Sequence, residues 1–516
     1  MFHSVLFPNR ELHQESRITV VPDYFRELNL DQIVLSITKQ RSEFGLEPFF
    51  YTPVRDIDTI AYRQEVMGDL DIPVLFARVK LFAQAINDIR RSRGELSKHL
   101  VDANSYHNDY LTRGRFLNTA EHYCRAISAL ITEVDPNTLH SRGLKSFWEY
   151  IRNYSASDAF LSLTAYIKKL RTELTTVEYC MLIKNSTIRV RKYEQQEDHS
   201  KRILEIFDKF KQGANKDYRH ELIEAPHADH VEAAVLNMVS SLYKDIFQDL
   251  NRFCGQYMNF LDDTIALFAS EVQFYLAYQE YMQRLSRVGL HFCYPKICTA
   301  KEHIYDYDGF DLALAEILLP NGSPVTNDFW LDQGERIMVI TGPNQGGKTT
   351  FARTFGQVHH LGCIGCPVPG TRAALYLFDY IFTHFGTEED LSTLSGKLQD
   401  DLIRLHRILK EASPSSIIMV NEIFSSTTLQ DALLLNKKMM DHIINLGSLA
   451  VCVTFLDELA SYSAETVSMV STVEPDDPTK RTYKVVRQAA DGLAYAIHIA
   501  QKRGLTYESL CRRLEA

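Results

Sequence analysis

The stretch that decides the fold runs from Thr341 to Thr350 and reads TGPNQGGKTT. It follows a short apolar run, RIMVIT (336–341), and precedes apolar residues at helical spacing, Phe351, Phe355 and Val358. A strand, a glycine-rich loop and a helix in this order are the setting of a phosphate-binding loop of the pattern G-x-x-x-x-G-K-[ST]. The candidate nucleotide-binding residues are therefore Gly342, Pro343, Asn344, Gln345, Gly346, Gly347, Lys348, Thr349 and Thr350.

Each part of this loop has a physical role toward a nucleotide such as ATP. The glycines let successive backbone N–H groups point at phosphate oxygens, and the helix N-terminus adds positive potential. We expect Lys348 to reach the β and γ phosphates and the Thr349 hydroxyl to contact Mg²⁺. The alternative, a glycine-rich turn with a chance lysine, leaves the flanking strand and helix unexplained.

A second strand ends in polar residues that suit the same chemistry. The run IIMV (417–420) is followed by Asn421 and Glu422. In a Walker B strand the first of these positions is normally Asp, which helps to hold Mg²⁺, and the second is Glu, which orients the attacking water. Asn421 keeps a carbonyl oxygen but lacks the charge, which predicts weaker Mg²⁺ retention. Glu422 is the candidate catalytic base, unless the pair is only a polar strand end.

The texture of the sequence divides the chain near residue 300. After Pro295, strand-like runs at 336–341, 417–420, 449–454, 467–473 and 482–486 alternate with helical patterns, which predicts an α/β domain with a largely parallel sheet. Between Pro73 and Pro295 only Pro136 and Pro226 occur, which predicts long helices. Apolar residues recur at helical spacing from Val231 to Gly289. One continuous helix there would be a rod on the order of 90 Å, acting as a lever or as a core helix.

Composition excludes several classes of protein. The 516 residues carry a formal charge of −10, and 45% are apolar, which is ordinary for a globular chain. No signal peptide or membrane-spanning run is recognised, and nine cysteines without a ligand pattern fit a reducing cytoplasm. The pair Cys363 and Cys366 lacks two further zinc ligands nearby, so we interpret it as buried packing.

The loop resembles that of the MutS family, whose hallmark is T-G-P-N-x-G-G-K-[ST]. The surroundings also resemble the family: VTND (325–328), CPVP (366–369), NEI (421–423), STT (426–428), GLAYA (492–496) and, upstream, LNLDQI (28–33) and TPVRD (52–56). The resemblance implies a helical core, lever and clamp followed by an ABC-type P-loop ATPase domain with a C-terminal helix-turn-helix. It divides the chain into a core (1–125), a clamp-like insertion (126–230), a lever helix (231–298) and the ATPase domain (299–516).

In ABC-type ATPases a signature segment of one subunit completes the nucleotide site of the other, so the resemblance implies a homodimer. The candidate residues are Ser395 and Gly396, although Ser395 is equally explained as an ordinary helix cap. The family usually has Thr-His-Tyr where this chain has Thr454-Phe455-Leu456. Phe455 cannot donate a hydrogen bond to a γ-phosphate, which with Asn421 predicts slow hydrolysis.

The resemblance also bears on the substrate. Full MutS proteins begin with a mismatch-reading domain that carries a Phe-x-Glu wedge, and here the core-like segment starts within the first thirty residues. We therefore expect no mismatch reading by such a wedge, and no nuclease domain after Ala516. The segment 184–219 has ten basic residues against six acidic ones, which fits either a DNA contact or a solvated helical face.

The favoured hypothesis is a cytoplasmic, homodimeric, MutS-like ATPase that forms an ATP-gated clamp on branched or otherwise non-mismatch DNA in repair or recombination. It would use ATP and Mg²⁺ and work with a repair protein partner, without a membrane. One alternative is a nucleotide-binding scaffold that barely hydrolyses ATP and recruits a protein. Another is an ATPase that acts on RNA or the ribosome.

Overall fold

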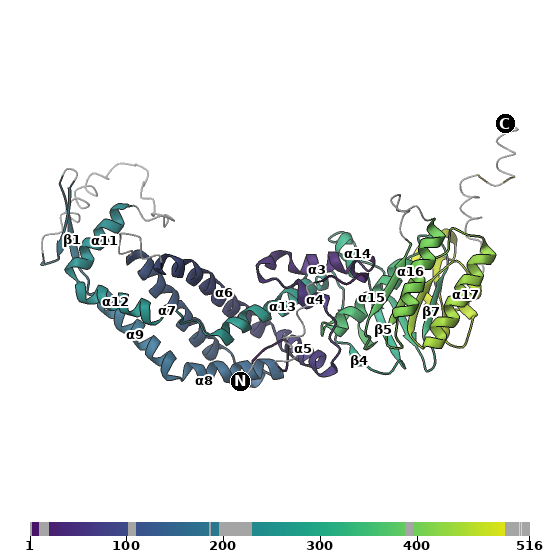
Figure 1. Cartoon of the computed structure of the whole chain (residues 1–516), viewed down its shortest axis with the longest axis horizontal. Helices are drawn as coiled ribbons and strands as arrows, with labels where there is room; N and C mark the ends of the chain where they lie inside the picture. Colours follow the sequence, from purple (N-terminus) through teal and green to yellow (C-terminus); the bar gives the residue numbers. More distant parts are fainter. Residues whose placement is uncertain are drawn as a thin grey trace, which may run out of the picture. The chain divides into compact units, whose positions relative to one another are not determined.

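The computed structural model describes residues 3–9, 20–101, 110–184, 187–195, 230–386, 396–490, 505 and 507. These residues pack as two compact units (Figure 1). Unit 1 comprises Met1–Phe76, Asn137–Lys145 and Glu271–Ala516, and unit 2 comprises Ala77–Pro136 and Ser146–Ser270. These two units do not coincide with the predicted core, clamp, lever and ATPase segments, and that division into four stays a prediction.

Unit 2 is helical, as predicted, with one exception. Its helices are most of α6 (Pro73–Val101), α7 (Tyr110–Glu133), most of α8 (Arg142–Ser155), α9 (Asp158–Thr175), α11 (His230–Leu242), α12 (Lys244–Gln256) and the start of α13 (Asp263–Ser286). Aromatic side chains such as Phe116, Phe253 and Phe260 fill its core. The exception is an antiparallel hairpin of β1 (Tyr179–Lys184) and β2 (Thr187–Lys192), in a region where mostly long helices were predicted.

The prediction of one continuous helix over 231–289 is wrong. The segment forms three helices, α11, α12 and α13, which are broken at Tyr243 and between Tyr257 and Asp262. Asp262 accepts hydrogen bonds from the backbone N–H groups of Thr264 and Ile265, both at 3.0 Å. A carboxylate in this position caps a new helix rather than continuing the old one. The apolar spacing continues across the breaks because each of the three helices packs apolar side chains into the core, and residues 271–279 of α13 are buried on every side.

The N-terminal part of unit 1 consists of short helices. These are α2 (Tyr24–Glu27), α3 (Leu30–Thr38), a 3₁₀ helix (Lys39–Phe44), α4 (Glu47–Tyr51) and α5 (Ile57–Leu70). Asp56 caps α5 by accepting from the Thr59 N–H at 2.9 Å. A second 3₁₀ turn, Pro136–Thr138, lies between α7 and α8.

The rest of unit 1 is an α/β domain with strands at all five predicted positions. Its main sheet has the order β10-β11-β12-β7-β13-β14, in which only β14 is antiparallel. The strands are β7 (Ile337–Thr341), β10 (Ile381–Phe385), β11 (Ile417–Asn421), β12 (Leu449–Val453), β13 (Thr466–Glu474) and β14 (Asp477–Arg487). A second sheet, β4-β9-β5-β6, contains Lys296–Cys298, Arg372–Tyr376, Ile304–Gly309 and Asn327–Leu331, and β3 (Phe292–Cys293) pairs with β8 (Val368–Pro369).

Helices cover both faces of the main sheet, as expected for parallel strands. On one face, α16 (Lys397–Glu411) and α17 (Leu429–Leu446) pack over Ile418, Val420 and their neighbours (Figure 1). On the other, α15 (Lys348–Cys363) approaches so closely that a Cβ on Gly356 would lie 3.1 Å from the Met419 sulfur. The remaining helices are α14 (Leu312–Leu318) and the 3₁₀ turn Asp457–Ser461.

Within the described residues no helix is long and apolar enough to cross a membrane. The segment GLAYA (492–496) and the predicted helix-turn-helix lie outside the described residues.

Two buried histidines on α15 make unit 1 sensitive to acid. Burial lowers the pKa of His359 to about 4, although its hydrogen bond to the Phe355 carbonyl opposes this. Below pH 6.5 the unfolded chain therefore binds a proton that the folded chain excludes, so stability is lost as the pH falls toward 4. The wild type should lose about 2 kcal/mol of unfolding free energy between pH 7.5 and pH 5 through this histidine, and His359→Phe should not show that loss. Urea unfolding of both proteins at pH 7.5 and pH 5 checks this. The prediction is contradicted if variant and wild type differ in unfolding free energy by the same amount at both pH values.

Candidate nucleotide site

The loop between β7 and α15 has the backbone that its glycines allow. Gly342 and Gly347 have φ values of +112° and +93°, which are left-handed conformations that side chains disfavour. Strand β13 also lies against the loop, because a Cβ on Gly346 would come within 2.2 Å of the Ser471 hydroxyl oxygen. Conformation therefore requires glycine at positions 342 and 347, and space requires it at positions 342 and 346.

Lys348 lies buried at the start of α15 and is turned toward its own loop. Its Nζ donates to the carbonyl oxygens of Gly342 at 2.8 Å and Pro343 at 3.2 Å, and it lies 3.8 Å from a carboxylate oxygen of Glu422. Burial lowers the pKa of Lys348, and the Glu422 charge partly opposes this. The structure therefore joins the two predicted catalytic residues in one ion pair.

The end of β11 brings the predicted Mg²⁺ residues together. The Thr349 hydroxyl donates to the Asn421 side-chain oxygen at 3.2 Å. Oxygen donors are the ligands that Mg²⁺ prefers, so these two residues fit the ion. Glu422 follows in a left-handed conformation, with φ of +52°, and its N–H donates to the Val453 carbonyl at 2.9 Å.

We expect Asn421→Asp to lower the Mg²⁺ concentration for half-maximal ATP turnover at least tenfold. The new carboxylate would stand beside the Thr349 hydroxyl, and a unit charge pair at 4 Å is worth about 4 kcal/mol at an effective dielectric near 20, before desolvation. A Mg²⁺ titration of turnover measures the effect. The control is Asn445→Asp, which adds the same charge at an exposed position of α17. An unchanged Mg²⁺ requirement would remove Asn421 from the metal site.

The remaining loop residues lie as follows. Asn344 and Gln345 are exposed, Gln345 has φ of +58°, and the Thr350 carbonyl accepts from the Thr354 hydroxyl inside α15. The Asn344 carbonyl accepts from Nε of Arg481 at 3.1 Å. Thr350 is therefore part of the first helical turn, while the Asn344 side chain is free to reach solvent or a ligand.

Phe455 lies directly at the site. Lys348 Nζ is 4.3 Å from the centre of the Phe455 ring, and half of the Phe455 side chain is exposed. The position follows β12, so its side chain faces the phosphate loop as the resemblance implied. The ring holds the lysine by a cation–π contact, but it offers no hydrogen bond to a phosphate.

Sequence reasoning missed two residues of the site, Ser471 and Arg481. The buried Ser471 hydroxyl donates to the Gly346 carbonyl at 2.6 Å, and Arg481 contacts Asn344 as described above. Both come from strands β13 and β14, more than 120 residues downstream of the loop. No motif marks them, because only the pairing of β13 with β7 brings them there.

The signature segment is described only in part. Gly396 is the residue before the first turn of α16, with an extended backbone and no side chain to cap the helix. Ser395 lies outside the described residues. The proposed role of both residues toward a second subunit stays a prediction.

The cysteine pair is part of the core. Cys363 and Cys366 are both fully buried, and burial raises the pKa of Cys363 to about 12 and that of Cys366 as well. Within the described ranges, no three His, Cys, Asp or Glu side chains are grouped so that they could hold a metal ion.

Comparison with known proteins identifies the domain that carries this site. Residues 338–512 match the family model of MutS domain V. This part of the chain is therefore similar to MutS domain V. The DNA mismatch repair protein MutS of Halalkalibacterium halodurans is 27% identical over 288 residues, which are 54% of this chain and 32% of that protein. Those of Bacillus cytotoxicus and Geobacillus thermodenitrificans are 30% and 28% identical, over 42% and 45% of this chain.

These matches span only a quarter to a third of the relatives' own length, 25% for Bacillus cytotoxicus and 26% for Geobacillus thermodenitrificans. The residues matched by MutS domain V include most of β7, the phosphate loop, β11 and Phe455. Members of the MutS family are ATPases. The activity of the whole chain is therefore inferred separately.

Proposed function

We propose that this chain is an ATP-dependent switch that forms a homodimeric clamp on branched or otherwise non-mismatch DNA. The observation that carries the nucleotide part is the convergence of four side chains at one point. Lys348 and Thr349 from α15 lie within 3.8 Å and 3.2 Å of Glu422 and Asn421 at the end of β11. A base, a cation and two oxygen donors at the mouth of a phosphate loop fit nucleotide triphosphate hydrolysis.

Each residue then has a defined task. Backbone N–H groups of residues 342–349 cradle the phosphates, and Lys348 must leave the Gly342 and Pro343 carbonyls to neutralise them. Thr349 and Asn421 would hold Mg²⁺, which supplies charge neutralisation when bound with ATP. Glu422, freed from Lys348, orients the attacking water and accepts its proton. Asn421 and Phe455 make this hydrolysis slow.

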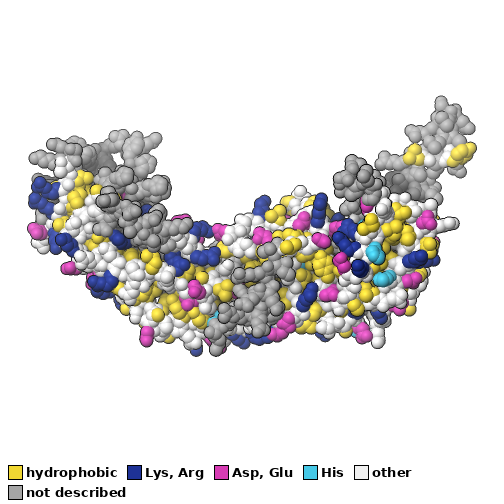
Figure 2. All heavy atoms as spheres, viewed as in Figure 1, with side chains coloured by type: hydrophobic (Ala, Val, Ile, Leu, Met, Phe, Trp, Pro, Cys, Tyr) yellow, Lys and Arg dark blue, Asp and Glu magenta, His cyan; other side chains and the backbone are white. Residues whose placement is uncertain are grey.

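The proposed DNA contact uses the hairpin of unit 2. Arg189, Arg191 and Lys192 are exposed on β2, and Tyr179 and Met181 are exposed on β1. Figure 2 shows basic side chains gathered at the end of unit 2 that carries this hairpin. Exposed guanidinium groups contact phosphates without reading sequence. Most of the basic segment 184–219 lies outside the described residues, so the hairpin arginines are the part that can be tested directly.

We expect Arg189→Gln with Arg191→Gln to weaken binding to a four-way junction and to lower the salt slope by about 1.8, since each lost phosphate contact removes about 0.9. A salt series of binding affinities, in the presence of a non-hydrolysable ATP analogue, measures both. The control is Arg26→Gln with Arg287→Gln, two exposed arginines of unit 1. An unchanged slope would remove the hairpin from the DNA contact. A steeper slope for RNA than for DNA would favour the RNA-acting alternative.

Neither Phe-x-Glu of this sequence is available as a base-stacking wedge. The sequence contains Phe-x-Glu only at Phe25-Arg26-Glu27 and Phe147-Trp148-Glu149. Phe25 and Phe147 are both buried, at 0% and 4% exposure, so neither ring is placed to stack on a base. We propose DNA shape as the feature that the helical clamp recognises.

A nucleotide-binding scaffold is the second candidate function, and Phe455 is the observation that favours it. Its ring contacts Lys348 in place of a group that could bond a γ-phosphate. In that case ATP binding without hydrolysis would change the conformation of the chain, and a repair protein would be recruited to the ATP-bound form. Turnover measurements separate the two candidates.

A further inference from the structure

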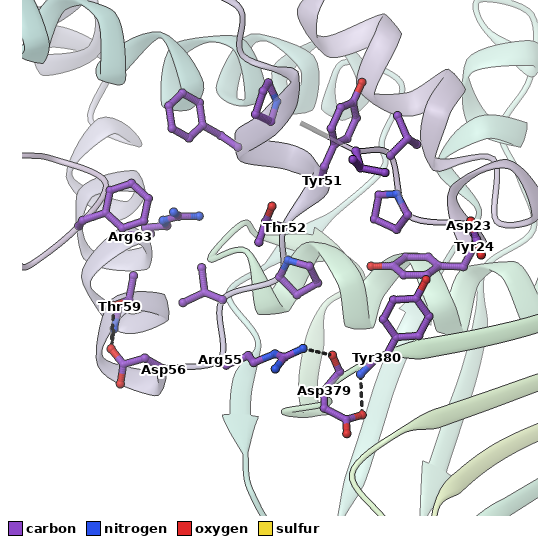
Figure 3. Close-up of a pocket in the computed structure, with 18 residues that line it drawn as sticks. Asp23, Tyr24, Tyr51, Thr52, Arg55, Asp56, Thr59, Arg63, Asp379 and Tyr380 are labelled. Atoms are coloured by element: carbon purple, nitrogen blue, oxygen red, sulfur yellow. Dashed lines mark hydrogen bonds between the residues drawn. The ribbon is translucent and has the colours of Figure 1, made fainter. Parts of the chain in front are cut away.

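Unit 1 contains a cavity away from the phosphate loop. It has a volume of about 670 Å³, within the range of small-molecule pockets. It lies between the segment that includes α2, α4 and the start of α5 and the loop that leads into β10 (Figure 3). Its wall is mainly apolar and aromatic, and includes Val21, Tyr24, Phe49, Tyr51, Val54 and Tyr380. The proposed nucleotide function does not use it.

One buried cation lines this cavity. Arg63 is 2% exposed, and its guanidinium donates through Nε to the Leu6 carbonyl at 3.1 Å and through Nη1 to the Ile364 carbonyl at 3.0 Å. Within the described ranges no carboxylate forms an ion pair with it and Nη2 has no hydrogen-bond acceptor. Figure 3 shows the guanidinium extended toward Thr52. The guanidinium also lies 4.9 Å and 5.6 Å from the ring centres of Phe7 and Phe274, and the Glu271 charge favours its protonated form. An anion at Nη2 would add a charge-assisted hydrogen bond to these contacts.

A second polar group lines the same cavity. The Thr52 hydroxyl oxygen is buried and has no hydrogen-bond partner among the described residues, although buried polar atoms nearly always have one. Two of the three acidic residues of the wall, Asp56 and Asp379 but not Asp23, already accept side-chain hydrogen bonds. Asp56 accepts from Thr59 at 2.7 Å, and Asp379 accepts from Ser416 at 2.8 Å. Arg63 and Thr52 therefore each bring an unused donor to the cavity that both of them line.

Hydrogen bonds to α15 hold the cavity wall in place. The Tyr24 hydroxyl lies 3.1 Å from Nδ1 of His360, and the Val54 N–H donates to the Cys363 carbonyl at 2.9 Å. Burial lowers the pKa of His360 to about 4, so the neutral ring donates through Nε2 to the Phe50 carbonyl and accepts from Tyr24 at Nδ1. A wall fixed in this way needs little rearrangement to receive a ligand.

We propose that this cavity binds a small organic anion, with an apolar or aromatic body and one carboxylate or sulfonate group. The body lies against Tyr51, Val54 and Tyr380, and the charged group accepts hydrogen bonds from Nη2 of Arg63 and the Thr52 hydroxyl. A charge-assisted pair of this kind is strong because it is shielded from water.

The probe for this site is 8-anilinonaphthalene-1-sulfonate, titrated into the full chain and followed by fluorescence. Its comparison is N-phenyl-1-naphthylamine, which has a similar body without the sulfonate. We expect Val54→Trp, which fills the cavity, to weaken both at least tenfold. We expect Arg63→Met to weaken the sulfonate at least tenfold and the uncharged compound less than threefold. Ile317→Trp, which places the same side chain at an exposed position of α14, should change neither.

Arg63 is buried, so a second variant guards against loss of folding. Thr52→Val keeps the shape of the side chain and should weaken the sulfonate about threefold. Equal affinity of Val54→Trp and the wild type for both probes would overturn the proposal. So would equal losses for the two probes on Arg63→Met and on Thr52→Val, since the anion preference would then be absent. The proposal would also be overturned if the probes bound only after residues 10–19 were replaced by a Gly-Ser linker. The cavity would then not be open to a ligand in the full chain.

Discussion

Lys348→Ala is expected to lower the affinity for ATP at least a hundredfold and to remove every nucleotide-dependent change of the chain. The lysine is the only residue of the G-x-x-x-x-G-K-[ST] match that brings a cation to the phosphates. A charge-assisted hydrogen bond to phosphate is worth about 1.5–3 kcal/mol, and loss of more than one gives a change of this size. Equilibrium binding of a fluorescent ATP analogue measures it.

The substitution has a matched control in Lys438→Ala, an exposed lysine of α17 in the same domain. Its nucleotide affinity should equal that of the wild type. Because Lys348 also contacts Phe455 and two loop carbonyls, thermal unfolding of both variants shows whether the loop is retained. Tight ATP binding by folded Lys348→Ala would disprove the phosphate-loop assignment.

Glu422→Gln is expected to lower ATP turnover at least a hundredfold while ATP binding stays within a few-fold. The amide keeps the size of the side chain but can no longer accept a proton from water, and positioned bases contribute about 10²–10⁴ in rate. The variant also loses the ion pair with Lys348, so that lysine is freed for the phosphates. We therefore expect an ATP-bound dimer to accumulate, as measured by light scattering and retained nucleotide.

Glu411→Gln, at the exposed end of α16, is the control for this change and should leave turnover as it is. Turnover of Glu422→Gln at the wild-type rate would remove Glu422 from catalysis.

The phosphate loop, the five strands and α15 were predictable because their signals are local. The run IMVIT (337–341) is apolar enough to predict a buried strand without knowledge of its partners. The motif itself places glycines where the loop has positive φ values. The parallel pairing of β11 and β12 then follows, since the segment between them is the helix α17. The meeting of Thr349 with Asn421 is a consequence of that order.

Other features depend on contacts between distant segments. The spacing from Val231 to Gly289 could not show that Asp262 caps a new helix, because Asp is tolerated inside long helices as well. Arg63 carries no signal in the sequence either, since an arginine on a helix is usually exposed. Its burial depends on Leu6 and Ile364, which are about 57 and 301 residues away in sequence.

The most direct test of the account is steady-state ATP turnover with Mg²⁺, alone and with homoduplex, mismatched and four-way-junction DNA, with Glu422→Gln as the blank. An ATP-gated clamp on branched DNA predicts slow turnover that rises with the junction and stays unchanged with the mismatch. Turnover at the level of the blank under every condition would contradict the proposed clamp. The chain would then act as a nucleotide-binding scaffold.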